Sequence, residues 1–178
     1  MKHNILVIAI IFLLCVGCNR NSTDDLAEIF GKKIILPANA RFTCNAADTV
    51  DMPIGDGYKI VCYIDSFGCI SCRLNLAEWT DYMDQLNSLV PDSVPLLIYL
   101  HPSKLRDARN AIRKADYTRP ICIDMNDEFG KANQQLLRHK IHTFLVDENY
   151  NVVLFGNPLS NSEIRELYIK TIVDNTIG

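Results

Sequence analysis

The chain has 178 residues, of which 48% are hydrophobic and 22% charged, and its formal net charge at pH 7 is −3. This length suits one domain that buries a full core without a metal or disulfide staple. The acidic balance and the lack of any basic cluster in the sequence argue against nucleic acid as a partner.

The N-terminal segment has the features of an export signal. A positively charged start precedes the apolar run Ile5–Val16, which is too short to span a bilayer. Gly17-Cys18 follows and resembles the lipobox of bacterial lipoproteins, in which the cysteine is lipidated after cleavage. Cleavage without a lipid is the alternative, because Cys15 stands where leucine is usual. We predict a signal peptide over 1–17, lipidation of Cys18, a polar tether over 18–32 and one domain over 33–178.

Past the tether, apolar runs and helical periodicity alternate. Two short strands, Lys33–Leu36 and Arg41–Cys44, are expected to form an N-terminal hairpin, and the β-branched run Lys59–Ile64 a buried strand. A helix is expected from about Arg73 to before Pro91, with an apolar face that comprises Leu76, Trp79, Met83 and Leu86.

The second half continues the alternation and ends in a hairpin and a helix. Strands are expected at Val94–Leu100, Pro120–Ile123, Thr143–Val146 and Val152–Phe155, and helices at Lys104–Ala115 and Glu128–Arg138. The last helix is expected to start at a Ser160–Glu163 capping box and to carry an apolar stripe of Ile164, Leu167, Tyr168 and Ile172. This order predicts an α/β fold with a mostly parallel central sheet, helices on both faces and a closing antiparallel hairpin.

Two cysteines mark the junction between the strand Lys59–Ile64 and the helix that follows. They are spaced Cys69-Ile70-Ser71-Cys72. A helix start presents unpaired N–H groups and the positive end of the helix dipole, so a cysteine there is held partly as thiolate. The spacing predicts thiol–disulfide exchange, with Cys69 as nucleophile and Cys72 as resolving thiol. Two reduced cysteines, a structural disulfide or half of a metal site are the alternatives.

The other cysteines of the domain fall in different surroundings. Cys62 and Cys122 lie inside apolar strand-like runs, where a buried free thiol is expected. Cys44 has a polar neighbourhood and no assigned role. After removal of Cys15 and lipidation of Cys18, an odd number remains, so these cysteines cannot all pair within the chain.

The order of elements, with the dithiol after the first long strand, resembles the thioredoxin superfamily. The similarity is carried by Ile121–Asp124 with Phe129–Asn133, by Thr143–Asp147, and by Gly156-Asn157-Pro158 followed by Glu166-Leu167-Tyr168. These stretches resemble exported, lipid-anchored thioredoxin-like thiol–disulfide oxidoreductases of Bacteroidota. The resemblance implies a thioredoxin-like three-layer sandwich with an extra strand and helix in mid-domain.

The same resemblance implies where such a protein works and with what. It implies a cell-envelope protein, lipid-anchored to the inner or outer membrane and facing the periplasm or the cell surface. It also implies exchange with protein dithiols and disulfides and with a membrane electron donor or acceptor. No cofactor is expected.

The sequence departs from the pattern of these relatives at four positions. Gly68 replaces the tryptophan before the first cysteine, and His142 replaces the cis-proline that packs against the dithiol. Asn75 stands where exported relatives carry a proton-handling acid, and Tyr63 aligns with the buried strand aspartate of the superfamily. The fold is therefore a firmer expectation than the activity.

Three further residues are candidate modulators of the dithiol. Asp65 is a candidate proton carrier, with a turn hydrogen bond at the strand end as the alternative. His142 is expected near the sulfurs, where its protonated form would lower the pKa of Cys69, unless it is simply an exposed imidazole. Ser71, between the cysteines, is expected to influence the reduction potential.

Three other functions use the same residues. Cys69, Cys72 and His142 offer soft ligands suited to copper(I) or zinc. A peroxidase would use Cys69 with Ser66, but Cys62 occupies the place of the proline expected there. Finally, the chain could be a non-catalytic surface lipoprotein that keeps the fold as an interaction module.

Overall fold

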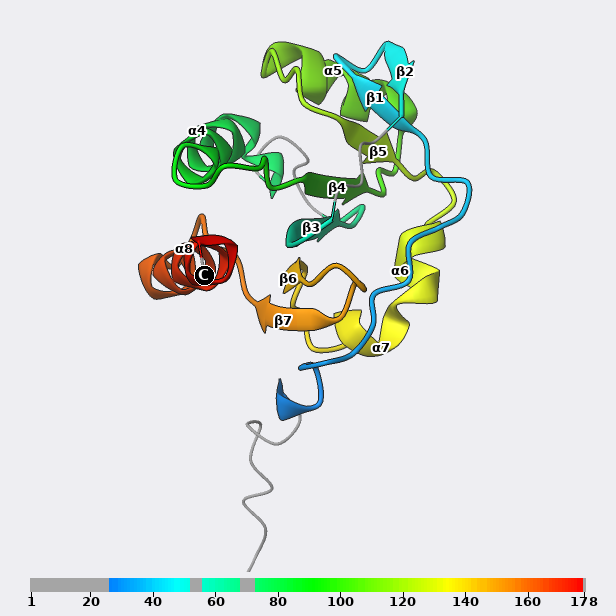
Figure 1. Ribbon diagram of the computed structural model, residues 1–178. Coiled ribbons are helices and arrows are strands. Elements are labelled where there is room, and N and C mark those ends of the chain that lie inside the picture. Colours follow the sequence, from blue (N-terminus) through cyan, green and yellow to red (C-terminus); the bar gives the residue numbers. More distant parts are fainter. Residues whose placement is uncertain (1–25, 52–55, 68–72, 178) are drawn as a thin grey trace, which may run out of the picture.

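The computed structural model describes residues 26–51, 56–67 and 73–177. Its strands are β1 (Phe42–Cys44), β2 (Asp48–Val50), β3 (Lys59–Ile64), β4 (Leu96–Leu100), β5 (Ile121–Ile123), β6 (Thr143–Val146) and β7 (Val152–Phe155). Its named helices are α4 (Leu76–Asn87), α5 (Leu105–Lys114), α6 (Glu128–Ala132), α7 (Gln134–Leu137) and α8 (Ser162–Ile177). The strands form one sheet in the order β2-β1-β5-β4-β3-β6-β7, with helices on both faces (Figure 1).

The sheet is mixed. β3, β4 and β5 are parallel neighbours at its centre. β6 and β7 continue it antiparallel on one side of β3, and the β1–β2 hairpin pairs antiparallel with β5 on the other. The expected α/β sandwich, its closing hairpin and its mid-domain strand and helix are therefore present, although parallel pairing is limited to the three central strands.

β3 connects the two halves of the core. All six of its residues are buried, and successive side chains point to opposite faces of the sheet. Ile60, Cys62 and Ile64 face the cluster formed with α4, α5 and α8, whereas Val61 and Tyr63 face the cluster formed with α6 and α7. Burial of each large apolar side chain stabilises the fold by roughly 1.5–3 kcal/mol. β3 is therefore firmly held in the core, and it fixes the position of Asp65, the residue that follows it.

The N-terminal segment differs from the expectation. Residues 33–36 do not form a strand, and the hairpin is made instead by β1 and β2. The segment crosses β7, where Gly31 N–H donates to Val152 O at 2.8 Å and Ile34 N–H to Tyr150 O at 2.8 Å. Ile29 and Ile34 are each 1% exposed. The folded domain therefore already includes residues 26–32, which the sequence assigns to the tether.

Two asparagines divide helices that the sequence predicts as continuous. Asn75, with φ of 41°, separates Arg73 and Leu74 from α4. Asn133, with φ of −116° and ψ of 24°, separates α6 from α7. Asparagine tolerates the left-handed region and bonds to nearby backbone better than most residues, which favours such interruptions.

The start of α8 also corrects the sequence-based expectation. Asn161 Oδ1 accepts a hydrogen bond from Ile164 N–H at 3.0 Å, so Asn161 caps the helix. Ser160 instead donates from its hydroxyl to Asn157 O at 3.3 Å. The expected apolar stripe is partly right, since Tyr168 is buried but Leu167 is 47% exposed.

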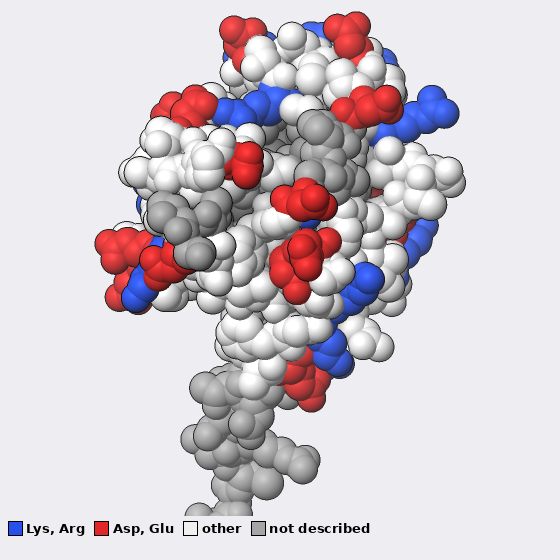
Figure 2. All heavy atoms as spheres, viewed as in Figure 1, with Lys and Arg blue, Asp and Glu red and all other residues white. Residues whose placement is uncertain are grey.

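On the face shown in Figure 2, acidic and basic side chains are interspersed. Among residues 26–51, 56–67 and 73–177, no helix has the length and hydropathy needed to cross a bilayer.

Candidate functional site

The proposed reactive residues lie outside the described part of the chain. Cys69, Ser71 and Cys72 belong to residues 68–72, and Cys18 to residues 1–25, neither of which the structure describes. The flanking residues are described, and Arg73 joins the two sides. Its guanidinium forms an ion pair with the Asp65 carboxylate and donates to Phe67 O at 2.6 Å. The chain before and after residues 68–72 is thus held together.

Asp65 acts as a turn residue. Its Oδ1 accepts hydrogen bonds from Phe67 N–H, at 3.0 Å, and from the Arg73 guanidinium. Partial burial favours the protonated acid, but these hydrogen bonds and the charge of Arg73 outweigh it and lower the pKa of Asp65 below its usual value. Asp65 is therefore ionised at neutral pH. This supports the turn interpretation and makes Asp65 a poor proton carrier near pH 7.

A cleft of about 390 Å³ lies beside this ion pair. It is bounded by the end of β3, the residues before β6 and the loop after β7, and the polar side chains that line it are Arg73, Asn75, Lys140, His142, Thr143 and Asn157. Arg73, which lines the cleft, follows Cys72 directly in the sequence. Of the described cavities, we therefore associate this cleft with the dithiol.

His142 lies in the cleft, half-buried, directly before β6. Tyr63 N–H donates to His142 O at 2.8 Å, and the two rings meet edge to face with centroids 5.9 Å apart. Burial lowers the pKa of His142 below its usual value, against the opposing effect of Asp65 and with a further contribution from Arg73. The neutral imidazole is therefore the favoured form at pH 7. The effect of a protonated His142 on the pKa of Cys69 stays a prediction, because Cys69 lies outside the described residues.

The buried cysteines are inert thiols, as the sequence predicts. Cys62 and Cys122 are free and buried, and burial raises the pKa of each to about 11. The Thr143 hydroxyl donates to Cys62 Sγ at 3.7 Å beneath the cleft. Cys44 is also free and half-buried.

A contact that sequence reasoning missed joins Tyr63 to Asp127. The Tyr63 hydroxyl donates to Asp127 Oδ1 at 2.7 Å, and its ring stacks on Phe129 with centroids 5.5 Å apart. The sequence marks Tyr63 only as the residue aligned with a buried aspartate. No local pattern pairs two residues that are 64 positions apart.

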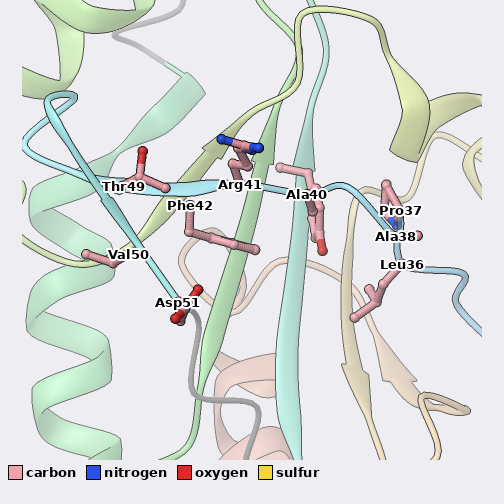
Figure 3. Close-up of a pocket in the computed structure, with 10 residues that line it drawn as sticks. Leu36, Pro37, Ala38, Ala40, Arg41, Phe42, Thr49, Val50 and Asp51 are labelled. Carbon is pink, nitrogen blue, oxygen red and sulfur yellow. The ribbon is translucent and has the colours of Figure 1, made fainter.

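A second cavity and the distribution of possible metal ligands offer no further site in the described residues. A cavity of about 510 Å³ lies between the N-terminal segment and the β1–β2 hairpin, but Arg41 and Asp51 lie apart in it (Figure 3). Within the described ranges, no group of three or more His, Cys, Asp or Glu side chains is placed to hold a metal. The predicted copper or zinc site needs Cys69 and Cys72, outside those ranges, and stays a prediction.

Comparison with known proteins identifies the fold. No protein-family model and no curated protein sequence matches the chain. A solved structure from Bacteroides thetaiotaomicron, described as a candidate protein disulfide isomerase, has a TM-score of 0.59 at 14% identity, over 84% of this chain and 91% of that one. The thioredoxin domain of a thiol-disulfide oxidoreductase from Bacteroides vulgatus has a TM-score of 0.55 at 12% identity, over 80% and 97%.

A structure that concerns peroxide reduction is also similar. The bacterioferritin comigratory protein of Xanthomonas campestris, whose structure concerns alkyl peroxide reduction, has a TM-score of 0.52 at 11% identity, over 80% of this chain and 98% of that one. The fold of this chain is thioredoxin-like, as the order of its elements predicts. At these identities the similarity establishes the fold and not the reaction.

Proposed function

We propose that the protein is a thiol–disulfide oxidoreductase that acts outside the cytoplasm through Cys69 and Cys72. The observation that carries the proposal is the CxxC spacing, which the sequence places between β3 and α4 of a thioredoxin-like fold. The described surroundings suit this chemistry, because a guanidinium, a neutral imidazole and a polar cleft lie at the same sheet end.

In the reducing direction, the Cys69 thiolate attacks one sulfur of a substrate disulfide. A mixed disulfide forms and the first substrate thiolate leaves. Cys72, as thiolate, then attacks the Cys69 sulfur, which forms the intramolecular disulfide and releases the second thiolate. Two electrons pass from the dithiol to the substrate, and a membrane dithiol donor restores the reduced pair.

The described residues can assist this exchange in two ways. Arg73 follows Cys72 directly in the sequence and supplies a positive charge, which favours thiolate over thiol. His142 is uncharged at pH 7, so it can accept a proton when a thiol ionises. Lys140, which is exposed on the rim of the cleft, adds a second positive charge there.

We further propose that a lipid on Cys18 holds this domain at a membrane. The apolar run before Gly17-Cys18 supports it. The polar stretch Asn19–Asp25, which follows Cys18 in the sequence, supports a tether between the lipid and the domain. Mass spectrometry of the mature N-terminus should find an acylated Cys18. An intact Met1, or an unmodified N-terminus elsewhere, would reject the anchor.

The activity is tested by insulin reduction with dithiothreitol as the electron source. Cys69→Ser should lower the rate by about 100-fold or more, since it removes the nucleophile. The matched control is Cys44→Ser, which removes a free, half-buried thiol and should leave the rate unchanged. A redox titration of the Cys69–Cys72 pair then gives the direction of electron flow. Equal rates for wild type and Cys69→Ser would contradict the proposal.

His142→Pro separates exchange from metal binding and from a role as an interaction module. For exchange, this change should leave insulin reduction intact or raise it, because it restores the residue that relatives carry at this position. For metal binding, it removes one ligand of three, and the affinity for copper(I) or zinc should fall by orders of magnitude. For an interaction module, neither readout changes, and the double variant Cys69→Ser with Cys72→Ser keeps the biological role.

A further inference from the structure

We propose that Tyr63 is a positioning residue for the cleft: its hydroxyl, held by Asp127, fixes the ring against which the imidazole of His142 is oriented. The inference rests on the proposed function for the catalytic meaning of His142. Its geometry, however, comes entirely from residues that the structure describes, and its test does not require catalysis.

Tyr63 is held from several directions. Its N–H donates to His142 O at 2.8 Å, and its hydroxyl donates to Asp127 Oδ1 at 2.7 Å. One face of the ring stacks on Phe129, with centroids 5.5 Å apart and an interplanar angle of 20°. His142 meets the ring edge to face, at 5.9 Å and 67°. The side chain therefore bridges the residue before β6 to the start of α6.

Asp127 is available to Tyr63 because another aspartate caps α6. Asp124 accepts hydrogen bonds from Glu128 N–H at 3.0 Å and from Phe129 N–H at 2.8 Å. Asp127 itself has φ of 55° and makes no side-chain cap. Its side chain accepts a hydrogen bond from the Tyr63 hydroxyl instead.

Gly130 provides the space for this carboxylate. A Cβ at position 130 would lie 2.2 Å from Asp127 Oδ1, so any other residue would displace the Asp127 side chain. Phe129, next in the sequence, stacks on Tyr63 and also on Tyr99, whose ring centroid lies 4.4 Å away. Three neighbouring residues thus hold one tyrosine: Asp127 accepts its hydrogen bond, Phe129 stacks on its ring, and Gly130 leaves space for the Asp127 side chain.

Charged or titratable groups face His142 from three segments. Asp65 and Arg73, on the two sides of residues 68–72, shift its pKa. Lys140, from the segment before β6, and Tyr63, from β3, line the same cleft. Tyr63 is 6% exposed and its hydroxyl is already donated to Asp127, so it contributes packing and not charge. Loss of the hydroxyl anchor should let the Tyr63 ring tilt, and the imidazole should then gain contact with water.

The experiment measures the pKa of His142 by NMR titration in the full mature protein. In Tyr63→Phe, better hydration should raise that pKa toward the ordinary histidine value. Gly130→Ala should act in the same direction, because it displaces the Asp127 carboxylate. Tyr99→Phe is the matched control, since it removes a hydroxyl from the same aromatic stack, and it should leave the pKa of His142 unchanged.

A second pair of variants keeps the inference testable if Tyr63→Phe does not fold. Asp127→Ala removes the acceptor and should raise the pKa of His142, whereas Asp127→Asn keeps an acceptor oxygen and should hold it near the wild-type value. Thermal unfolding checks that each variant is folded. An unchanged pKa of His142 in folded Tyr63→Phe or Asp127→Ala would overturn the inference. Insulin reduction is measured separately, so an inactive wild type would reject the proposed function alone.

Discussion

The side-chain amide of Asn133 forms hydrogen bonds with both the N–H and the C=O of Ile35, as the backbone of a paired strand would. Its Oδ1 accepts from Ile35 N–H at 2.8 Å, and its Nδ2 donates to Ile35 O at 2.8 Å and to Phe129 O at 2.9 Å. Asn133 is 3% exposed, so water is not available to replace these partners. One buried side chain therefore attaches the N-terminal segment to the break between α6 and α7.

Asn133→Ala should lower the free energy of unfolding by about 2–3 kcal/mol, because it removes three hydrogen bonds and leaves backbone groups without partners. Urea unfolding measures it. The control is Gln134→Ala at the exposed neighbouring position, which should change stability by no more than about 0.5 kcal/mol. If both variants lose the same amount, the Asn133–Ile35 contact is not a main support of the segment.

The buried thiols should resist alkylation in the folded protein. Burial raises the pKa of Cys62 and of Cys122 to about 11, so almost no thiolate is present at pH 8. Iodoacetamide followed by peptide mass spectrometry should label these two cysteines only after denaturation. Cys44, which is half-buried, serves as the internal comparison. Fast labelling of Cys62 in the native protein would contradict the structure.

Gly156 should not tolerate a side chain. Its φ is 111°, its N–H donates to Thr143 O at 2.9 Å, and a Cβ there would lie 3.3 Å from Ile164 Cδ1. Gly156→Ala should lower the free energy of unfolding by about 1–3 kcal/mol. Gly31→Ala is the control, because its φ is 71° and nothing lies within 4 Å of an added Cβ. Gly31→Ala should cause backbone strain without a clash, and should therefore lower the free energy of unfolding by less than Gly156→Ala does.

The two members of the ion pair beside the cleft should shift the pKa of His142 in opposite directions. Asp65 raises the pKa of His142 and Arg73 lowers it. Asp65→Asn should therefore lower that pKa and Arg73→Met should raise it, as measured by NMR titration. The control is Asp84→Asn, which breaks the separate ion pair with Arg119 and should have no effect on His142. Shifts of the same sign in both site variants would contradict this arrangement.

The stability of the protein should fall on mild acidification. The pKa of His142 is lower in the folded than in the unfolded chain, so the unfolded state binds the proton first. The contribution of His142 to the free energy of unfolding is fully present above about pH 6.5, the ordinary histidine pKa, and is lost as the pH falls through the pKa of His142 in the folded protein. Asp65, whose pKa is also lowered, acts in the same sense in more acidic solution. Urea unfolding at pH 7.5 and 5.5 should show a smaller loss for His142→Gln than for wild type; an equal loss would refute the assignment.

The sequence alone predicts the central strands and the closing hairpin. The bounds of β3, β6 and β7 agree with the prediction because each is a short apolar run between turn residues. The turn between β6 and β7 is also a local device, since Asp147 Oδ1 accepts from Asn149 N–H at 2.9 Å and from Asn151 N–H at 2.8 Å. The inert character of Cys62 follows in the same way from its apolar neighbours.

The candidate site is only partly readable from the sequence. The CxxC pair is visible as a pattern, and its placement stays a prediction because Cys69 and Cys72 lie outside the described residues. Asp65 and His142 are visible as titratable residues near it. Their protonation states, however, depend on burial and on the Arg73 guanidinium, which no residue pattern in the sequence reports.

Only the tertiary structure decides the contacts between distant segments. The Tyr63–Asp127 hydrogen bond joins residues 64 apart, and the Asn133–Ile35 pair joins residues 98 apart. Local propensity cannot specify such pairs, because each partner taken alone is compatible with several conformations. The apolar pattern of the sequence therefore determines which segments are buried, whereas the requirement that buried polar groups find partners determines how those segments meet around the cleft.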